Sequence, residues 1–408
     1  MPGVIESDVD PVEAIEIAHD VGRQAAPHAA QHDLDASFVS EGYRAVRDFG
    51  YGTMAVPTAL GGSGHGLEGI CRAQAALANY CASTSLAIAM HQHAVMTMAW
   101  RWSRGDTEVE SVLRRVVSDG LILSASGTLN PAMISVDATP VEGGFVVTGQ
   151  RRLCSGAPGA DVLVTAVRLN TEGESRPITM LIPLGGMGVE ILDDWDAMGM
   201  RGSGTNGVKM HEAFVPAENA LYVDGKGPRF RRPSAAVGSG AGPASPGHRR
   251  GEVQGILMPG LHISLAIIAA SYLGASDHAC AEAIRMVAGT PRANTVVAER
   301  LTGLMRHEIR MGWWALEGMV GQTADESLGT REQMITTMLG KRQVILSSIH
   351  AAELAMEMLG SRSYMRGDVF ERTLRDVRAG VTHPLTPELT LVQVGYATLA
   401  AAARQKDS

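Results

Sequence analysis

The sequence is poor in several features that mark particular protein classes. Aromatic residues make up only 4% of the chain although hydrophobic residues reach 45%, so small and aliphatic side chains supply most of the apolar content. This composition favours closely packed helices over an aromatic-rich β-sandwich. The formal net charge of -8 offers no basic face, which argues against a nucleic-acid partner.

Cysteine is also scarce, and long apolar runs are missing. The four thiols lie far apart, without a CxxC or a Cys/His ligand spacing, so we expect neither a disulfide framework nor a metal site. The first residues, MPGVIESDVDPVEA, carry acids where a signal peptide would carry bases and an apolar stretch. No uninterrupted apolar run reaches the roughly 18 residues that a membrane span needs. We therefore expect a cytoplasmic protein with reduced thiols and no membrane contact.

The periodicity of apolar residues divides the chain into four segments. Residues 1–118 show helical spacing, interrupted by the turn-like stretch GYGTMAVPTALGGSGHG. Short β-branched runs between turns predict a β-domain over 119–224. Residues 225–256 are rich in Gly, Pro, Ser and Arg, which predicts a mobile loop or linker. The helical period returns over 257–408, in long helices with broad apolar faces that suit a bundle or a subunit interface.

Four segments resemble the acyl-CoA dehydrogenase superfamily, in the family's order and over nearly the whole chain. They are GYGTMAVPTALGGSG, VTGQRRLCSGAPGADVLV, DDWDAMGMRGSGTNGVKMHEAFVPAENAL and EMLGSRSYMRGDVFERTLRDVRAG. The resemblance implies a mostly α fold with N-terminal helices, a β-barrel-like middle domain and a C-terminal four-helix bundle. It also implies a homotetramer.

The resemblance further implies a flavin, FAD or FMN, between the β-domain and the C-terminal helices. Ser155, next to Cys154, falls where the family places a Thr against the reactive edge of the flavin, although an ordinary strand serine is the alternative. Leu153 stands where many relatives have a Trp that shields the flavin face. Ser126 and Thr128 are further implied flavin contacts, in a segment that departs from the family pattern. Arg201, Ser203 and Thr205 lie in the Gly-x-Arg segment, which a turn held by its own side chains would explain equally well. Arg375 is also an implied contact.

The base of an acyl-thioester dehydrogenase is missing. Such an enzyme needs a carboxylate that removes the α-proton of the substrate. The family usually supplies a Glu after its Arg-Asp pair, and a gapless count from Arg375 puts Pro384 at that position. Two candidates for a relocated base lie close by. His383 could accept a proton near neutral pH, whereas Glu388 is more simply explained as a capping or solvent-facing residue of the last helix.

Three features resemble the group D branch of the superfamily: a Cys-Ser strand at the flavin, a His in the apolar fourth helix, and a His-Pro pair after Arg-Asp-x-Arg. Members of this branch work as flavin monooxygenases with reduced flavin from a partner reductase. His91 and His93 lie two apart on a predicted helix, so at most one of them faces the cofactor. We favour an O2-using monooxygenase that hydroxylates nitrogen, sulfur or carbon, with His93 and His383 as acid–base groups. Two alternatives stay open: an acyl-CoA or acyl-carrier-protein thioester dehydrogenase with a relocated base, and a catalytically silent flavin-binding protein.

Overall fold

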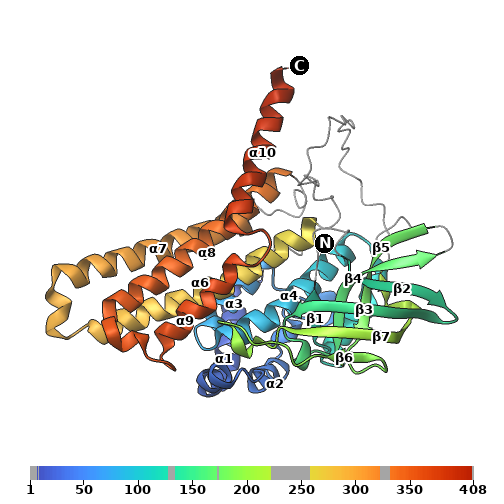
Figure 1. The fold of residues 1–408 in the computed structure, drawn as a ribbon, viewed down its shortest axis with the longest axis horizontal. Helices are drawn as coiled ribbons and strands as arrows, with labels where there is room; N and C mark the ends of the chain where they lie inside the picture. The colour runs from blue at the N-terminus through green and yellow to red at the C-terminus, as the bar shows by residue number, and fades with distance from the viewer. Residues whose placement is uncertain are drawn as a thin grey trace.

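The structure is a computed structural model of the chain and describes residues 7, 9–126, 134–171, 174–221, 258–321 and 331–406. Helices form both ends of the chain and strands form its middle (Figure 1). The chain is therefore mostly α with a central β-domain, as the sequence predicts. The predicted loop over 225–256 and the predicted flavin contact Thr128 lie outside the described residues.

The N-terminal helices surround one buried helix. They are α1 (Pro11–Asp35), α2 (Ser40–Asp48), α3 (Leu67–Ala78), α4 (Ala82–Ser103) and α5 (Glu110–Ser118). The stretch between α2 and α3 that was predicted as a turn holds two short 3-10 helices, Tyr51–Thr53 and Thr58–Leu60. Most residues of α4 are buried, including the polar side chains of His91 and Gln92. Polar groups on this helix must therefore find partners inside the protein.

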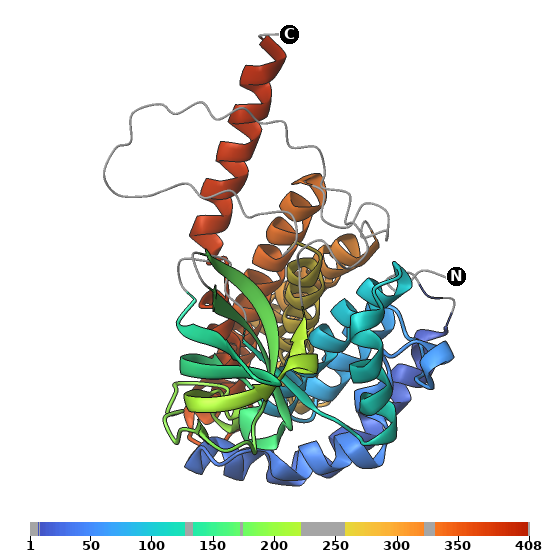
Figure 2. The same cartoon turned by 90° about the vertical axis from the view of Figure 1, so that its right-hand side faces the viewer.

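The strands form one sheet beside the N-terminal helices (Figure 2). The strands are β1 (Leu123–Ser126), β2 (Val136–Val141), β3 (Gly144–Cys154), β4 (Val162–Thr171), β5 (Glu174–Pro183), β6 (Val189–Ile191), β7 (Asn206–Pro216) and β8 (Ala220–Leu221). Their order is β6-β7-β3-β2-β4-β5-β8, and β1 pairs in parallel with β4. The register of β3 against β7 shifts between Arg151 and Cys154, which is a β-bulge at the end of the strand.

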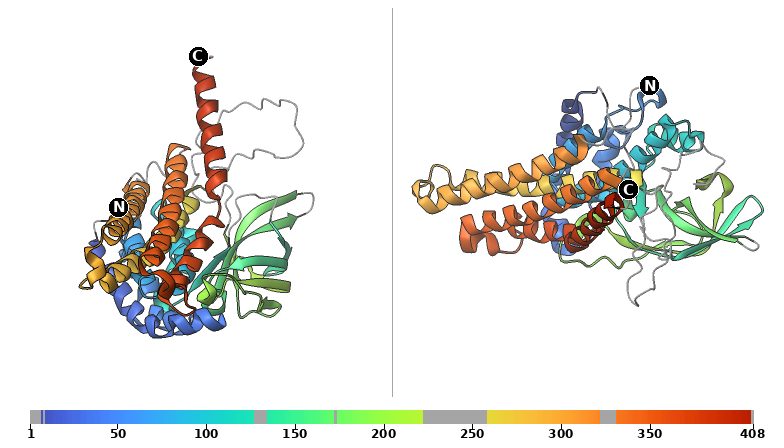
Figure 3. Two further views of the ribbon diagram at one scale, coloured as in Figure 1. Left: turned by 60° about the vertical axis from the view of Figure 1, so that its left-hand side comes forward. Right: turned by 90° about the horizontal axis from the view of Figure 1, so that it is seen from above.

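The C-terminal helices form a long bundle, seen from two further sides in Figure 3. They are α6 (Met258–Val287), α7 (Val296–Gly321), α8 (Arg331–Leu359), α9 (Val369–Arg378) and α10 (Pro387–Lys406). The last of them, α10, projects away from the body of the molecule (Figures 1 and 2). Several of its apolar side chains are exposed, namely Leu389, Leu391, Val392, Tyr396 and Leu399. This helix offers an apolar surface that the described part of the chain does not cover.

Helix α6 is the core element that both helical parts share. A Cβ atom at Gly274 would lie 2.1 Å from the carbonyl oxygen of Ala75, so the backbones of α6 and α3 touch. Among the described residues, Gly260–Val287 is long and apolar enough to cross a membrane, and 83% of its most apolar window is buried inside the fold. Asp277 and Glu282 interrupt the apolar run, which is why the sequence alone does not reveal a segment of this length. Burial in the core explains its composition.

Candidate functional site

The bulged end of β3 carries three of the predicted flavin contacts. Leu153 has a φ of 59°, in the left-handed region that branched side chains rarely adopt, and its side chain is 64% exposed. Cys154 and Ser155, the next two residues, are buried. Burial raises the pKa of the Cys154 thiol to about 11, so this sulfur stays protonated. An apolar side chain held outward on a strained backbone is suited to line a ligand.

Three buried hydroxyl groups form a cluster at Ser155, two residues after Leu153. The hydroxyl of Thr205 donates a hydrogen bond to Oγ of Ser155 at 2.9 Å, and the hydroxyl oxygens of Thr205 and Ser203 are 2.7 Å apart. All three side chains are almost fully buried. Because each hydroxyl group both donates and accepts, this chain of three has a donor or acceptor left for a ligand edge. The structure thus brings Ser155 together with Ser203 and Thr205 of the Gly-x-Arg segment.

Strand β1 lies alongside the bulge. The hydroxyl of Ser124 donates to the carbonyl oxygen of Ser155 at 3.0 Å, and the hydroxyl of Ser126 donates to that of Arg152 at 3.4 Å. Both serines of β1 are buried. The predicted contacts Ser126 and Ser155 therefore both lie where β1 meets the end of β3, which their distance in the sequence does not show.

The two histidines of α4 have different environments. His91 is fully buried; its Nδ1 accepts from the backbone N–H of Leu123 at 3.0 Å, and its Nε2 donates to the carbonyl oxygen of Gly52 at 2.7 Å. Both ring nitrogens of His91 are therefore used in holding α4 against β1 and the turn after α2. His93 is half-buried, and its Nδ1 is buried without a hydrogen bond to any described residue. Burial lowers the pKa of His93 to about 4, although the nearby carbonyl of Ala89 acts in the opposite direction.

His383 lies in the turn between α9 and α10. Its Nε2 is 2.7 Å from the hydroxyl oxygen of Tyr272, which is buried on α6. Lys341, 1% exposed on α8, donates from Nζ to the carbonyl oxygens of Gly380, His383 and Leu385 at 3.2, 2.9 and 2.9 Å. Burial lowers the pKa of His383 to about 4, and the charge of Lys341 acts in the same direction. The imidazole is therefore neutral at physiological pH.

The sequence analysis missed Tyr272, Lys341 and also His262. His262 on α6 is 1% exposed, its Nδ1 is 3.0 Å from Oγ1 of Thr337, and its Nε2 has no partner within the described chain. Burial lowers the pKa of His262 to about 4. Thr337 lies one helical turn before Lys341 on α8, so His262 and the turn of His383 approach neighbouring positions of one helix. In the sequence, the available signal for His262 was that a polar residue lies within a strongly apolar helical run.

The predicted arginines make architectural contacts. Arg375 donates two hydrogen bonds, at 2.8 and 2.6 Å, to the carboxylate of Asp33 and a third, from Nε, to Glu371 at 2.7 Å. Arg201 donates from Nε to the carbonyl oxygen of Asp33 at 2.6 Å and from Nη1 to Asp196 at 2.8 Å. These contacts join the end of α1 to α9 and to the segment before β7. Both guanidinium groups thus already donate hydrogen bonds to protein oxygen atoms.

Glu388 is exposed in the first turn of α10. Its side chain thus lies where the capping or solvent-facing alternative expects it. The turn before it, residues 379–387, reads AGVTHPLTP and contains no acidic residue. Asp376, just before that turn, is 3% exposed and accepts a hydrogen bond from the backbone N–H of Met200. Burial raises the pKa of Asp376 to about 7.

The residues at the bulge fit a flavin. The tricyclic ring needs an apolar wall and polar partners along its heteroatom edge. Leu153 supplies an exposed apolar side chain, and the hydroxyls of Ser155, Ser203 and Thr205 supply donors and acceptors. On α4, which packs against β1, the Nδ1 of His93 is a buried polar atom without a hydrogen bond to any described residue, and a ligand could satisfy it.

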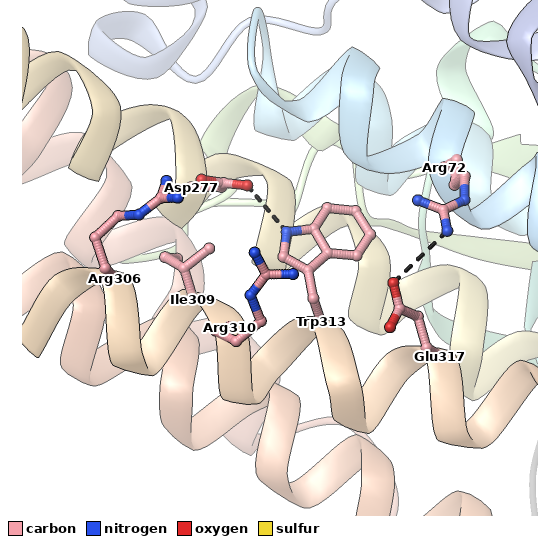
Figure 4. Close-up of a pocket in the computed structure, with 7 residues that line it drawn as sticks. All are labelled: Arg72, Asp277, Arg306, Ile309, Arg310, Trp313 and Glu317. Atoms are coloured by element: carbon pink, nitrogen blue, oxygen red, sulfur yellow. Dashed lines mark hydrogen bonds and ion pairs between the residues drawn. The ribbon is translucent and has the colours of Figure 1, made fainter.

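A pocket of about 260 Å³ lies elsewhere, between α3, α6 and α7 (Figure 4). Trp313 donates from Nε1 to Asp277 at 3.0 Å, and Arg72 lies 3.6 Å from the carboxylate of Glu317. Arg306 also lines it, together with Ile309 and Arg310. None of the predicted site residues is among its lining.

Comparison with known proteins shows which proteins the chain resembles. Residues 16–111 match the model of the acyl-CoA dehydrogenase N-terminal domain. The putative acyl-CoA dehydrogenase YdbM of Bacillus subtilis is 23% identical over 87% of this chain and 88% of its own length. The L-evernosamine nitrososynthase of a Micromonospora species is 26% identical over 86% of this chain and 81% of its own.

A solved structure of KijD3 in complex with FMN and dTDP-3-amino-2,3,6-trideoxy-4-keto-3-methyl-D-glucose has the same fold. Its TM-score is 0.78 at 23% identity, and the match covers 98% of this chain and 97% of that one. The sequence match and the fold agree. Residues 16–111 carry an acyl-CoA dehydrogenase N-terminal domain, the chain has the fold of acyl-CoA dehydrogenase-like flavoenzymes, and it is a flavin-dependent oxidoreductase.

Proposed function

We propose that this protein is a flavin-dependent monooxygenase that uses O2 to hydroxylate an organic substrate. The observation that carries the proposal is the turn over residues 379–387, where superfamily dehydrogenases are expected to hold their base. Pro384 occupies that position, the turn has no carboxylate, and a neutral His383 precedes the proline. Oxygen insertion requires a water-excluding pocket and hydrogen-bond donors more than it requires a strong base.

The chain's own residues would hold the flavin and manage a proton. Ser155 and its hydroxyl neighbours would contact the polar edge of the ring, and Leu153 would cover part of its face. Reduced flavin, when bound, supplies the electrons that oxygen activation needs. His93 and His383 are neutral at working pH because burial lowers both pKa values to about 4. A neutral imidazole can accept a proton on one nitrogen while donating from the other.

The substrate that we propose is an amine, and the flavin that we propose is FMN. The name of the Micromonospora relative describes a nitrososynthase acting on an amino sugar, and the KijD3 complex contains FMN and an amino-sugar nucleotide. These names support oxygenation at nitrogen in this chain as well. A separate flavin reductase would then supply reduced FMN.

We propose a cytoplasmic homotetramer. The support from the structure is α10, which projects from the body and exposes apolar side chains such as Val392, at 59%, and Leu399, at 74%. A second subunit that packs on α10 would bury them.

The proposal is tested with isotopic oxygen. The protein is supplied with FMN and an unrelated NADH-dependent FMN reductase, under ¹⁸O2, with a panel that contains isobutylamine, an amino-sugar nucleotide, dibenzothiophene and indole. A product with one or more ¹⁸O atoms, seen by mass spectrometry only when the protein is present, is expected from the amines. The proposal would be contradicted if no compound of the panel gained ¹⁸O and all consumed O2 were recovered as hydrogen peroxide.

Variants assign the histidines. His93→Ala and His383→Ala should each lower the product formed per O2 consumed by about 10²-fold, the usual effect of removing an acid–base group. His307→Ala is the matched control, because His307 is exposed on α7. Equal losses in all three variants would contradict the assignment.

A further inference from the structure

Lys341 is a buried cation that pairs with none of the carboxylates in the described part of the chain. It is among the largest side chains that are fully buried, and no ion pair joins it to a described acidic residue. A buried ammonium group is unfavourable unless its donors are satisfied. Nζ meets this need with three backbone carbonyl oxygens, at 2.9 to 3.2 Å, so all three of its N–H groups have acceptors.

The three acceptors belong to one short turn. Gly380, His383 and Leu385 lie between α9 and α10, so a single cation on α8 binds the beginning, middle and end of the segment that carries the histidine. The imidazole of His383 then extends to α6, where its ring centroid is 5.8 Å from that of Tyr272. The backbone of this residue is thus fixed from α8 and its side chain from α6.

The titratable groups around the imidazole of His383 come from three helices. Tyr272 on α6 donates to or accepts from Nε2 and, being buried, has a pKa raised well above its ordinary value, so it is neutral. Asp376 on α9 acts electrostatically on Tyr272. Lys341 on α8 is the group whose positive charge acts on His383 directly. A cation next to an imidazole disfavours the imidazolium form.

We propose that Lys341 is a positioning residue for His383: it holds the 380–385 turn in the arrangement in which the imidazole meets Tyr272. Its charge adds to the burial that keeps that imidazole unprotonated. The catalytic meaning of this arrangement rests on the proposed function, because it requires that His383 serves the reaction. The arrangement itself does not depend on that function and can be measured separately.

The test compares Lys341→Met, Lys341→Arg and Ser276→Ala in the full-length chain. Met has nearly the length of Lys but no charge and no donor, whereas Arg keeps the charge. Ser276→Ala is the control for general loosening, because the hydroxyl of Ser276 donates to the carbonyl oxygen of Ser348 between the same helices, α6 and α8, at 2.8 Å. The readouts are amide hydrogen exchange over residues 379–387 and the pKa of His383 from exchange at its imidazole C2 position, both by mass spectrometry.

Lys341→Met should speed amide exchange in the turn at least tenfold and raise the pKa of His383 by about one unit, the shift that one unit charge within roughly 10 Å produces at an effective dielectric constant of about 20. Lys341→Arg should restore the low pKa at least in part, and Ser276→Ala should change neither readout. An unchanged turn and pKa in Lys341→Met, or the same changes in Ser276→Ala, would overturn the proposal.

Two further measurements keep the result unambiguous. Burial lowers the pKa of Lys341 to about 8, so in the unaltered protein the turn should exchange faster above that pH, after correction for base catalysis. This test remains if Lys341→Met does not fold, and a turn that stays equally protected at pH 9.5 would contradict the proposal. If His383→Ala keeps fully coupled turnover while Lys341→Met still shifts the pKa of His383, the proposed catalytic use of His383 fails and the positioning role stands.

Discussion

Replacement of His91 by leucine tests whether His91 has a structural role, in contrast to the acid–base role proposed for His93. His91 is fully buried, and its two ring nitrogens bind the N–H of Leu123 at 3.0 Å and the carbonyl oxygen of Gly52 at 2.7 Å. Leucine has a similar volume but no polar atom. The variant would leave one backbone donor and one backbone acceptor buried without partners, at the point where α4 meets β1.

The expected loss follows from these two groups. An unsatisfied buried donor or acceptor costs about 1–3 kcal/mol, so His91→Leu should lower the free energy of unfolding by about 2–6 kcal/mol. The control is His93→Leu on the same helix: the Nδ1 of His93 has no hydrogen bond to a residue that the structure describes, and its loss should cost less than about 1 kcal/mol. Urea unfolding at pH 7.5, followed by circular dichroism, measures both.

The pH dependence has a defined sign. Burial lowers the pKa of His91 to about 4, below the ordinary value of 6.5, so the folded state favours the neutral ring. Its contribution to stability is complete above pH 6.5 and is lost as the pH falls through 4. His91→Leu should therefore reduce the acid sensitivity of unfolding in this window. A loss below 1 kcal/mol in His91→Leu, or an equal loss in His93→Leu, would refute the assignment of His91 as the structural histidine.

Three further predictions concern the cofactor, the core and the assembly. Ser155→Ala should weaken FMN binding about fivefold, from the loss of one hydrogen bond of about 1 kcal/mol, without unfolding the protein; Ser135→Ala, which removes an exposed hydroxyl that bonds Gln150 at 2.5 Å, is the control in fluorescence titration. Arg375→Met should lower the free energy of unfolding by about 3–5 kcal/mol in denaturant titration, because it strands the buried carboxylate of Asp33. Sedimentation at micromolar concentration should show a tetramer, and a clean monomer would contradict that assembly.

Apolar periodicity was sufficient for locating the helices and strands because it is a local property. The spacing of apolar residues in α7 and α8 and the β-branched runs of β3 to β5 are set by the face that each element buries. The family resemblance then supplied the order of the three parts. The length and burial of α6 were less visible, since Asp277 and Glu282 interrupt its apolar sequence.

The site was less predictable because its partners are distant in the sequence. Lys341 and its acceptor Gly380 are 39 residues apart, and Tyr272 and His383 are 111 residues apart. No local spacing encodes such pairs. The same limit applies to α4, where the sequence predicts that the two histidines differ but only the tertiary contacts of His91 show which one is structural. It also applies to Arg375, whose carboxylate partner Asp33 lies at the other end of the chain.

Anaerobic mixing of the flavin-loaded, oxidised protein with a series of saturated acyl-CoA thioesters tests the central claim most directly. A dehydrogenase reduces its flavin when the α-proton is removed, so the flavin absorbance near 450 nm would fall at once. We predict that the absorbance stays unchanged, because Pro384 stands where the base is expected and the turn over 379–387 has no carboxylate. Rapid bleaching by an acyl-CoA, abolished in His383→Ala or Glu388→Gln, would contradict the monooxygenase and identify a dehydrogenase with a relocated base.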